Sequence, residues 1–264
     1  MSRWLACIIF SVAISCSNPS EPELIADVAI YADAGCWQES VQAAQKMFEW
    51  MGYTVAWIKA GNINSGELDR YRLLCVPGGD MYQYAQDISS QGMGNIRNFI
   101  RKGGGYIGIC GGAYFAAEKV FWQNSQLSMA SLNLFSGTAK GPVNEIVAYP
   151  KYGICQINIF DKTHPIAQSA ADNMWILYYW GPEFTLNSGA SNVDIIGWYE
   201  RGGSAAMLAI TYGTGRAFII GTHPEIEEDS GRDGVDWGDE LDDHESDWEL
   251  MKHATQWCLR DGVK

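Results

Sequence analysis

Short apolar runs alternate with amphipathic segments along the first half of the chain. The runs, which are typical of buried strands, lie at residues 27–31, 54–58, 71–76 and 106–109. Residues 39–51 and 95–102 carry apolar side chains at helical spacing, which predicts helices. Strands that alternate with helices predict a doubly wound, mostly parallel α/β sheet, in which ligands bind at the carboxyl ends of the strands.

The second half of the chain is less regular. Short strands are predicted at 153–159, 193–198, 206–212 and 217–221, with a hairpin turn between the last two. Residues 178–182 are aromatic, and we interpret them as a cover for the core rather than as a pocket wall. Residues 227–247 are rich in Asp and Glu, which predicts a solvated insertion before a final helix. Their spacing does not match a calcium-binding loop, so no metal or other cofactor is expected.

Length and charge narrow the class of protein. The chain has 264 residues, enough for one large α/β domain, and its hydrophobic content of 47% is typical of a globular fold. The formal net charge is −13. Because phosphate binding needs a basic face, nucleic acid is not an expected partner.

The first residues resemble an export signal. Arg3 is followed by an apolar core, 5–14, that is too short to span a bilayer. The residues before Cys16 fit ordinary signal peptidase and also resemble a bacterial lipoprotein signal, and both cut the same bond. We favour the lipoprotein because 16–25 is a polar tether. The domain, 26–264, is therefore predicted to be exported and held at the cell-envelope membrane only by its lipidated N-terminus; otherwise it is periplasmic or secreted.

A candidate nucleophile follows the apolar run 106–109. Gly108 and Gly112 flank Cys110 at minus two and plus two, which is the spacing of a nucleophile elbow. Such a turn from strand to helix strains the central residue, and the glycines avoid collisions around it. The helix, predicted to start at Ala113, would favour the thiolate through its dipole. The alternative is a glycine-rich turn that holds a small buried cysteine.

Two further motifs follow strand ends. Gly78 and Gly79 come directly after the run 71–76, where they form either a simple turn or a place for a ligand to approach the backbone. His223 and Glu225 follow the last predicted strand. On an extended backbone their side chains point the same way, so the carboxylate can orient the imidazole toward the elbow. This is the order of nucleophile, base and orienting group.

The joint pattern is more specific than its parts. The three motifs occur in the order Val76-Pro77-Gly78-Gly79, Gly108-Ile109-Cys110-Gly111-Gly112 and His223-Pro224-Glu225. In this the chain resembles the class I glutamine amidotransferases. It is more closely similar to the family named after the N-terminal domain of biotin-protein ligase, chiefly through residues 96–110 and 177–182.

The resemblance implies a flavodoxin-like amidotransferase fold and a set of roles. Cys110 would be the nucleophile, His223 the general base and Glu225 its orienting group. The backbone N–H groups of Gly79 and Gly111 would form an oxyanion hole. Biotin ligation does not follow, because that chemistry belongs to a separate domain with a Gly-Arg-Gly-Arg-type loop, and this sequence has no such run.

Three functions remain open on the sequence. The first is a cysteine hydrolase or acyl-transferase that acts on a small-molecule or peptide amide. The second is a binding module that keeps the amidotransferase shell without its chemistry. The third is redox sensing at Cys110, with a disulfide to Cys36 as one form of it.

Overall fold

The computed structural model describes residues 23–228, 230–241 and 245–261. The predicted signal segment 1–15, Cys16 and most of the tether lie outside these residues, so export and lipidation stay predictions. Among the helices that the structure describes, none is both long enough and apolar enough to cross a membrane.

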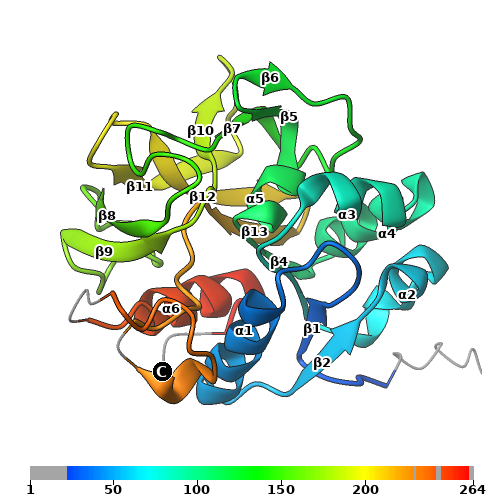
Figure 1. Cartoon of the computed structure of the whole chain (residues 1–264). Helices are drawn as coiled ribbons and strands as arrows, with labels where there is room; N and C mark the ends of the chain where they lie inside the picture. The colour runs from blue at the N-terminus through cyan, green and yellow to red at the C-terminus, as the bar shows by residue number, and fades with distance from the viewer. Residues whose placement is uncertain (1–22, 229, 242–244, 262–264) are drawn as a thin grey trace, which may run out of the picture.

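One half of the sheet is parallel and carries the motifs (Figure 1). Its strands, in spatial order, are β2 (Val55–Ile58), β1 (Val28–Tyr31), β3 (Leu73–Val76), β4 (Gly105–Ile109) and β13 (Gly215–Ile220). Each is parallel to its neighbours in this order. Together with the helices on both faces, this confirms the predicted doubly wound α/β fold.

The other half extends the sheet largely with antiparallel strands. From β13 it continues through β12 (Ala205–Tyr212), β10 (Glu183–Leu186), β7 (Phe135–Gly141), β5 (Ala117–Trp122) and β6 (Ser125–Gln126). A branch from β12 holds β11 (Val193–Tyr199), β8 (Gly153–Asn158) and β9 (Asn173–Tyr178). Only β5 and β7 run parallel in this half among the strands described. The predicted hairpin joins β12 to β13.

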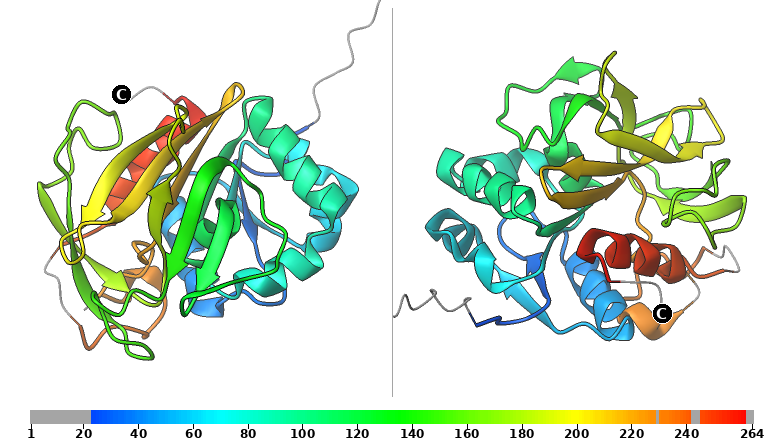
Figure 2. Two further views of the ribbon diagram at one scale, coloured as in Figure 1. Left: turned by 90° about the horizontal axis from the view of Figure 1, so that it is seen from above. Right: turned by 180° about the vertical axis from the view of Figure 1, so that it is seen from behind.

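Helices cover both faces of the parallel half (Figure 2). One face carries α1 (Gln38–Trp50) and α6 (Trp248–Leu259). The other carries α2 (Ala60–Ser65), α3 (Met81–Asp87), α4 (Ser90–Arg101) and α5 (Gly111–Ala116). The strands serve both cores by alternation: Val28 and Ile30 pack toward α1, and Ala29 and Tyr31 pack toward the opposite cluster.

Strand register brings the three motifs together. β4 lies between β3 and β13, with Gly108 opposite Val76 and Ile109 opposite Ile220. The backbone N–H of Cys110 donates to the carbonyl of Ile220 at 2.9 Å. The segments that leave β3, β4 and β13 therefore meet at the carboxyl edge of the sheet, as the parallel topology predicts.

Two local expectations were wrong. The helix after Cys110 begins at Gly111 and ends at Ala116, where the chain enters β5. The acidic segment is not fully solvated, because four of its carboxylate residues are buried, namely Glu227, Glu228, Asp233 and Asp247. The Asp233 carboxylate accepts the N–H groups of Glu227 at 3.0 Å and Val235 at 3.1 Å. These four residues of the segment are therefore packed into the fold.

The glycines of the elbow give a first prediction. A Cβ at Gly112 would lie 2.0 Å from the carbonyl oxygen of Val76, so Gly112→Ala forces β3 and α5 apart. We expect a loss of about 1–3 kcal/mol or more in the free energy of unfolding, measured by urea denaturation. Gly94→Ala in α4 is the matched control, because a Cβ there meets nothing within 4 Å. It should stabilise the protein slightly, and equal losses in both variants would contradict the packing argument.

Candidate active site

Cys110 occupies a strained turn between β4 and α5. Its φ of 46° and ψ of −98° lie outside the regions that side-chain-bearing residues ordinarily adopt. A Cβ at Gly108 would lie 2.7 Å from the carbonyl oxygen of Gly112, so the turn needs glycine at both flanks. The predicted elbow geometry is present, and the thiol is almost buried, with 7% exposure.

His223 and Glu225 form a buried pair beside the elbow. Nδ1 of His223 lies 2.9 Å from Oε1 of Glu225, and the two side chains are 1% and 0% exposed. The local backbone differs from the prediction, because Glu225 lies in a turn closed by the N–H of Ile226 on the carbonyl of His223. The turn, rather than an extended strand, brings the two side chains together.

The imidazole is held on several sides. The Trp37 ring stands edge-on to it, with ring centroids 5.0 Å apart. A Cβ at Gly78 would lie 2.5 Å from the ring carbon Cε1, so only glycine leaves room for the imidazole there. Trp248 donates its indole N–H to the backbone carbonyl of Glu225 at 3.1 Å, which anchors the carboxylate residue.

The environment of His223 favours its charged form. Burial alone would lower its pKa, but the Glu225 carboxylate and the nearby Cys110 sulfur outweigh that effect. The pKa of His223 therefore rises from 6.5 to about 10. At neutral pH the ring is an imidazolium that donates from Nδ1 to Glu225.

This shift predicts a pH dependence of stability. Since the pKa of His223 is raised on folding, its stabilising contribution is complete below pH 6.5 and is lost as the pH rises toward about 10. The difference in unfolding free energy between wild type and His223→Gln should therefore shrink between pH 6.5 and 10. Urea titrations of both proteins at several pH values measure it. A constant or growing difference would contradict the raised pKa.

Ser40, at the start of α1, links the pair to the glycine loop. Its fully buried hydroxyl donates to Oε1 of Glu225 at 2.5 Å and accepts the N–H of Gly78 at 2.9 Å. One hydrogen-bonded chain thus runs from the Gly78 backbone to the imidazole. We did not predict this residue, because a lone serine in an amphipathic helix carries no local signal.

The two predicted oxyanion donors lie next to each other. A Cβ at Gly111 would be 2.4 Å from the carbonyl oxygen of Gly79, so the two backbones are in contact. Within the described residues, neither N–H donates to a backbone or side-chain acceptor. Gly79 has a φ of +146° and lines the cavity described next, whereas Gly111 is not among the residues that line it.

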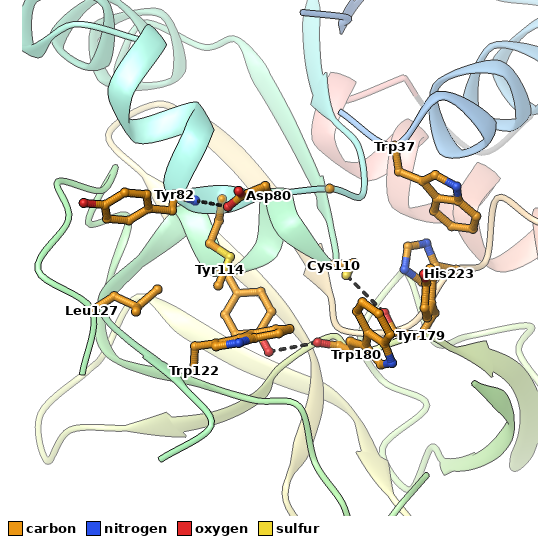
Figure 3. A pocket seen from close by; sticks show the side chains of 12 residues that line it. Trp37, Asp80, Tyr82, Cys110, Tyr114, Trp122, Leu127, Tyr179, Trp180 and His223 are labelled. Carbon is orange, nitrogen blue, oxygen red and sulfur yellow. Dashed lines mark hydrogen bonds between the residues drawn. The ribbon is translucent and has the colours of Figure 1, made fainter. Parts of the chain in front are cut away.

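A cavity of about 490 Å³ opens in front of the thiol (Figure 3). Cys110 and His223 lie side by side at one end, and Tyr82, Leu127 and Trp122 line the other. In this conformation the thiol donates to the carbonyl of Tyr179 at 3.5 Å. Nε2 of His223 is buried and has no hydrogen-bond partner among the described residues.

Our interpretation of the aromatic segment 178–182 was wrong in part. Tyr179 and Trp180 line the cavity, although we expected the segment to cover the core. Tyr178, by contrast, is fully buried. Trp37 and Trp122, which the sequence did not single out, are further parts of the wall.

The cysteines that the structure describes are free thiols. No disulfide joins the five that the structure describes, which are Cys36, Cys75, Cys110, Cys155 and Cys258. Burial raises the pKa of Cys36 to about 11, and its thiol donates to the carbonyl of Tyr31 at 3.4 Å. In this structure Cys110 lies in the site as a free thiol, without a disulfide to Cys36.

A comparison with protein families matches residues 26–256 to the model described as "Biotin-protein ligase, N terminal". The chain belongs to this family. The match spans the parallel sheet, the elbow and the His223–Glu225 pair, so the whole of the site described above lies within the matched region.

Curated relatives share parts of this domain. The chain is 28% identical to the biotin–protein ligase of Schizosaccharomyces pombe over 163 residues, which are 58% of this chain and 25% of the ligase. It is 39% identical over 75 residues to an uncharacterized protein of Chlamydia muridarum, covering 27% of this chain and 29% of that protein. The matches thus span about a quarter of the length of these relatives.

Solved structures confirm the amidotransferase fold of this family member. PurLQS from Thermotoga maritima superposes with a TM-score of 0.60 at 14% identity, covering 87% of this chain and 97% of that one. A glutamine amidotransferase from the same organism gives a TM-score of 0.54 at 14% identity, covering 89% and 97%. At these identities the likeness shows the fold alone.

Proposed function

We propose that this domain is a cysteine-nucleophile amidohydrolase or acyl-transferase, with Cys110, His223 and Glu225 as its triad. The observation that carries the proposal is a strained, cavity-lining Cys110 beside a buried imidazole that a carboxylate orients at 2.9 Å. A structural cysteine requires neither the strain nor an oriented base. The family membership and the amidotransferase fold support the same function.

The geometry supports a two-step reaction. The Cys110 thiolate attacks the amide carbonyl, and the N–H groups of Gly79 and Gly111 stabilise the oxyanion. The His223 imidazolium then gives its Nε2 proton to the departing amine, so that a thioester to Cys110 and a neutral imidazole remain. In the second step His223 takes a proton from water or another acceptor nucleophile, which attacks the thioester. The acyl group leaves on that nucleophile, and the thiolate of Cys110 and the imidazolium of His223 are regenerated.

The test is a screen of amides with mass detection of the acylated enzyme. We expect a mass increase on Cys110 in the wild type, and loss of turnover in both Cys110→Ala and His223→Ala. Their losses should be similar, because triad members act as a unit. Undiminished turnover in Cys110→Ala would exclude the proposal. Ligand binding without any acyl-enzyme would favour the binding-module alternative.

We also propose that the domain is exported and tethered to a membrane through a lipidated Cys16. Support comes from the signal-like residues 1–15 and the polar tether after them. Metabolic labelling with a fatty acid should mark the full chain and not Cys16→Ala. An unlabelled wild type recovered with its first residues uncut would contradict this proposal.

A further inference from the structure

The walls of the cavity are mostly aromatic. Five rings form a continuous row along it, from Trp37 through Tyr179, Trp180 and Trp122 to Tyr114. Successive ring centroids are 5.2, 4.4, 6.5 and 6.1 Å apart. Such a surface offers flat apolar faces to a ligand and one negative π-face after another to a cation.

The row is held in place at an energetic cost. Trp180 has a φ of +64°, an unfavourable backbone conformation for so bulky a residue. Its carbonyl accepts the Tyr114 hydroxyl at 3.0 Å, and its indole N–H donates to the carbonyl of Lys151 at 3.0 Å. Strain that two hydrogen bonds stabilise at a cavity wall indicates that the position of the indole matters for the ligand.

Apart from the His223 imidazolium, which is paired with Glu225 beside Cys110, the charge around the cavity has one sign. No lysine or arginine is among the described residues that line it. Asp80 contributes a carboxylate, which accepts the N–H of Tyr82 at 2.9 Å at the start of α3. A ligand carboxylate placed beside Asp80, away from His223, would lose its hydration without gaining a cationic partner, which is unfavourable.

These observations distinguish between amide substrates. Free glutamine presents an ionised carboxylate close to its amide. The described lining holds no lysine or arginine to receive it, and the His223 imidazolium is already paired with Glu225. A ring attached to the amide would instead stack on Trp180 and Trp122, and a positive charge on that ring would face π-electrons and Asp80. We propose that the cavity selects amides that carry a planar, uncharged or cationic ring and that it discriminates against free glutamine. This inference rests on the proposed function of the Cys110 site.

Binding to Cys110→Ala tests the selectivity apart from the chemistry. The probes are 4-phenylbutanamide, its para-carboxylate, its para-aminomethyl derivative and glutamine, measured by isothermal titration calorimetry. We expect the neutral and cationic ring amides to bind at least about tenfold more tightly than the carboxylate or glutamine. Equal affinities, or tighter binding of glutamine, would overturn the inference.

Matched variants locate the effect. Trp180→Leu should reduce the preference for a ring, whereas Trp57→Leu, whose side chain is 53% exposed on β2, should not. Asp80→Asn keeps an acceptor for α3 and should narrow the difference between carboxylate and neutral probes. If the difference in affinity between the carboxylate and neutral probes is the same in Asp80→Asn as in the wild type, the charge of Asp80 has no role in the selectivity.

Failure of this inference can be told from failure of the proposed function. If Cys110→Ala binds ring amides selectively but Cys110 of the wild type is never acylated, the proposed reaction is wrong and the proposed ligand class stands. Acylation of Cys110 by glutamine and by the ring amide at equal rates would keep the chemistry and overturn the ligand class.

Discussion

His223→Ala is expected to slow the alkylation of Cys110 by iodoacetamide at pH 7 by at least about tenfold. Iodoacetamide reacts with the thiolate, and the imidazolium of His223, which lies beside Cys110 at one end of the cavity, stabilises that charge. Without it, the thiol faces only the carbonyl of Tyr179 and apolar rings. Peptide mapping of the alkylated protein over time gives the rate at Cys110 itself.

The control is His253→Ala, which removes an imidazole that lies on α6 and contacts Ser169. Its alkylation rate should equal that of the wild type. If alkylation of Cys110 is slow in the wild type and His223→Ala leaves its rate unchanged, the elbow has only a structural role. That result would favour the binding-module alternative.

Ser40→Ala is expected to lower turnover by about tenfold to a hundredfold and the unfolding free energy by about 1–3 kcal/mol. The substitution removes the donor to Glu225 and leaves the buried N–H of Gly78 without its acceptor. The carboxylate then loses one of the two contacts that set its position against the imidazole. Steady-state kinetics and urea denaturation measure the two losses.

A positioning role for Ser40 differs from a merely structural one in its pH profile. Because Ser40 acts on Glu225 and through it on His223, Ser40→Ala should shift the alkaline limb of the rate profile. Ser40→Thr, which keeps the hydroxyl, should restore that limb. Ser65→Ala, an exposed serine on α2, should change neither property. If Ser40→Ala loses stability but keeps the wild-type pH profile of the rate, Ser40 has only a structural role.

The acidic segment shows why pattern alone misjudges burial. A run of Asp and Glu predicts side chains that are exposed to solvent. Asp233 is nevertheless fully buried, because its carboxylate accepts hydrogen bonds from two backbone N–H groups. Arg232 lies 4.0 Å from the ring of Trp248 and pairs with Glu227 at 2.9 Å. Composition records the charges of such a segment but not the partners that make their burial possible.

The sequence by itself determined the features that depend on neighbouring residues. Apolar runs and helical spacing predicted the parallel sheet, because side-chain burial within an element follows a short period. The elbow at Cys110 was predictable because strand, glycines and helix are contiguous. The order of the motifs at strand ends, together with the family resemblance, predicted that Cys110 and His223 share one edge of the sheet. That β13 lies next to β4 was known only from the structure.

Only the tertiary structure decided what depends on residues far apart in the chain. Ser40 reaches Gly78 across 38 positions and Glu225 across 185, so no local pattern marks it. The aromatic wall joins Trp37 to Tyr179 and Trp122 to Trp180, rings that come from separate loops and strands. A tryptophan's hydrophobicity is the same in a core and in a cavity wall, and the packing around it alone determines which it becomes.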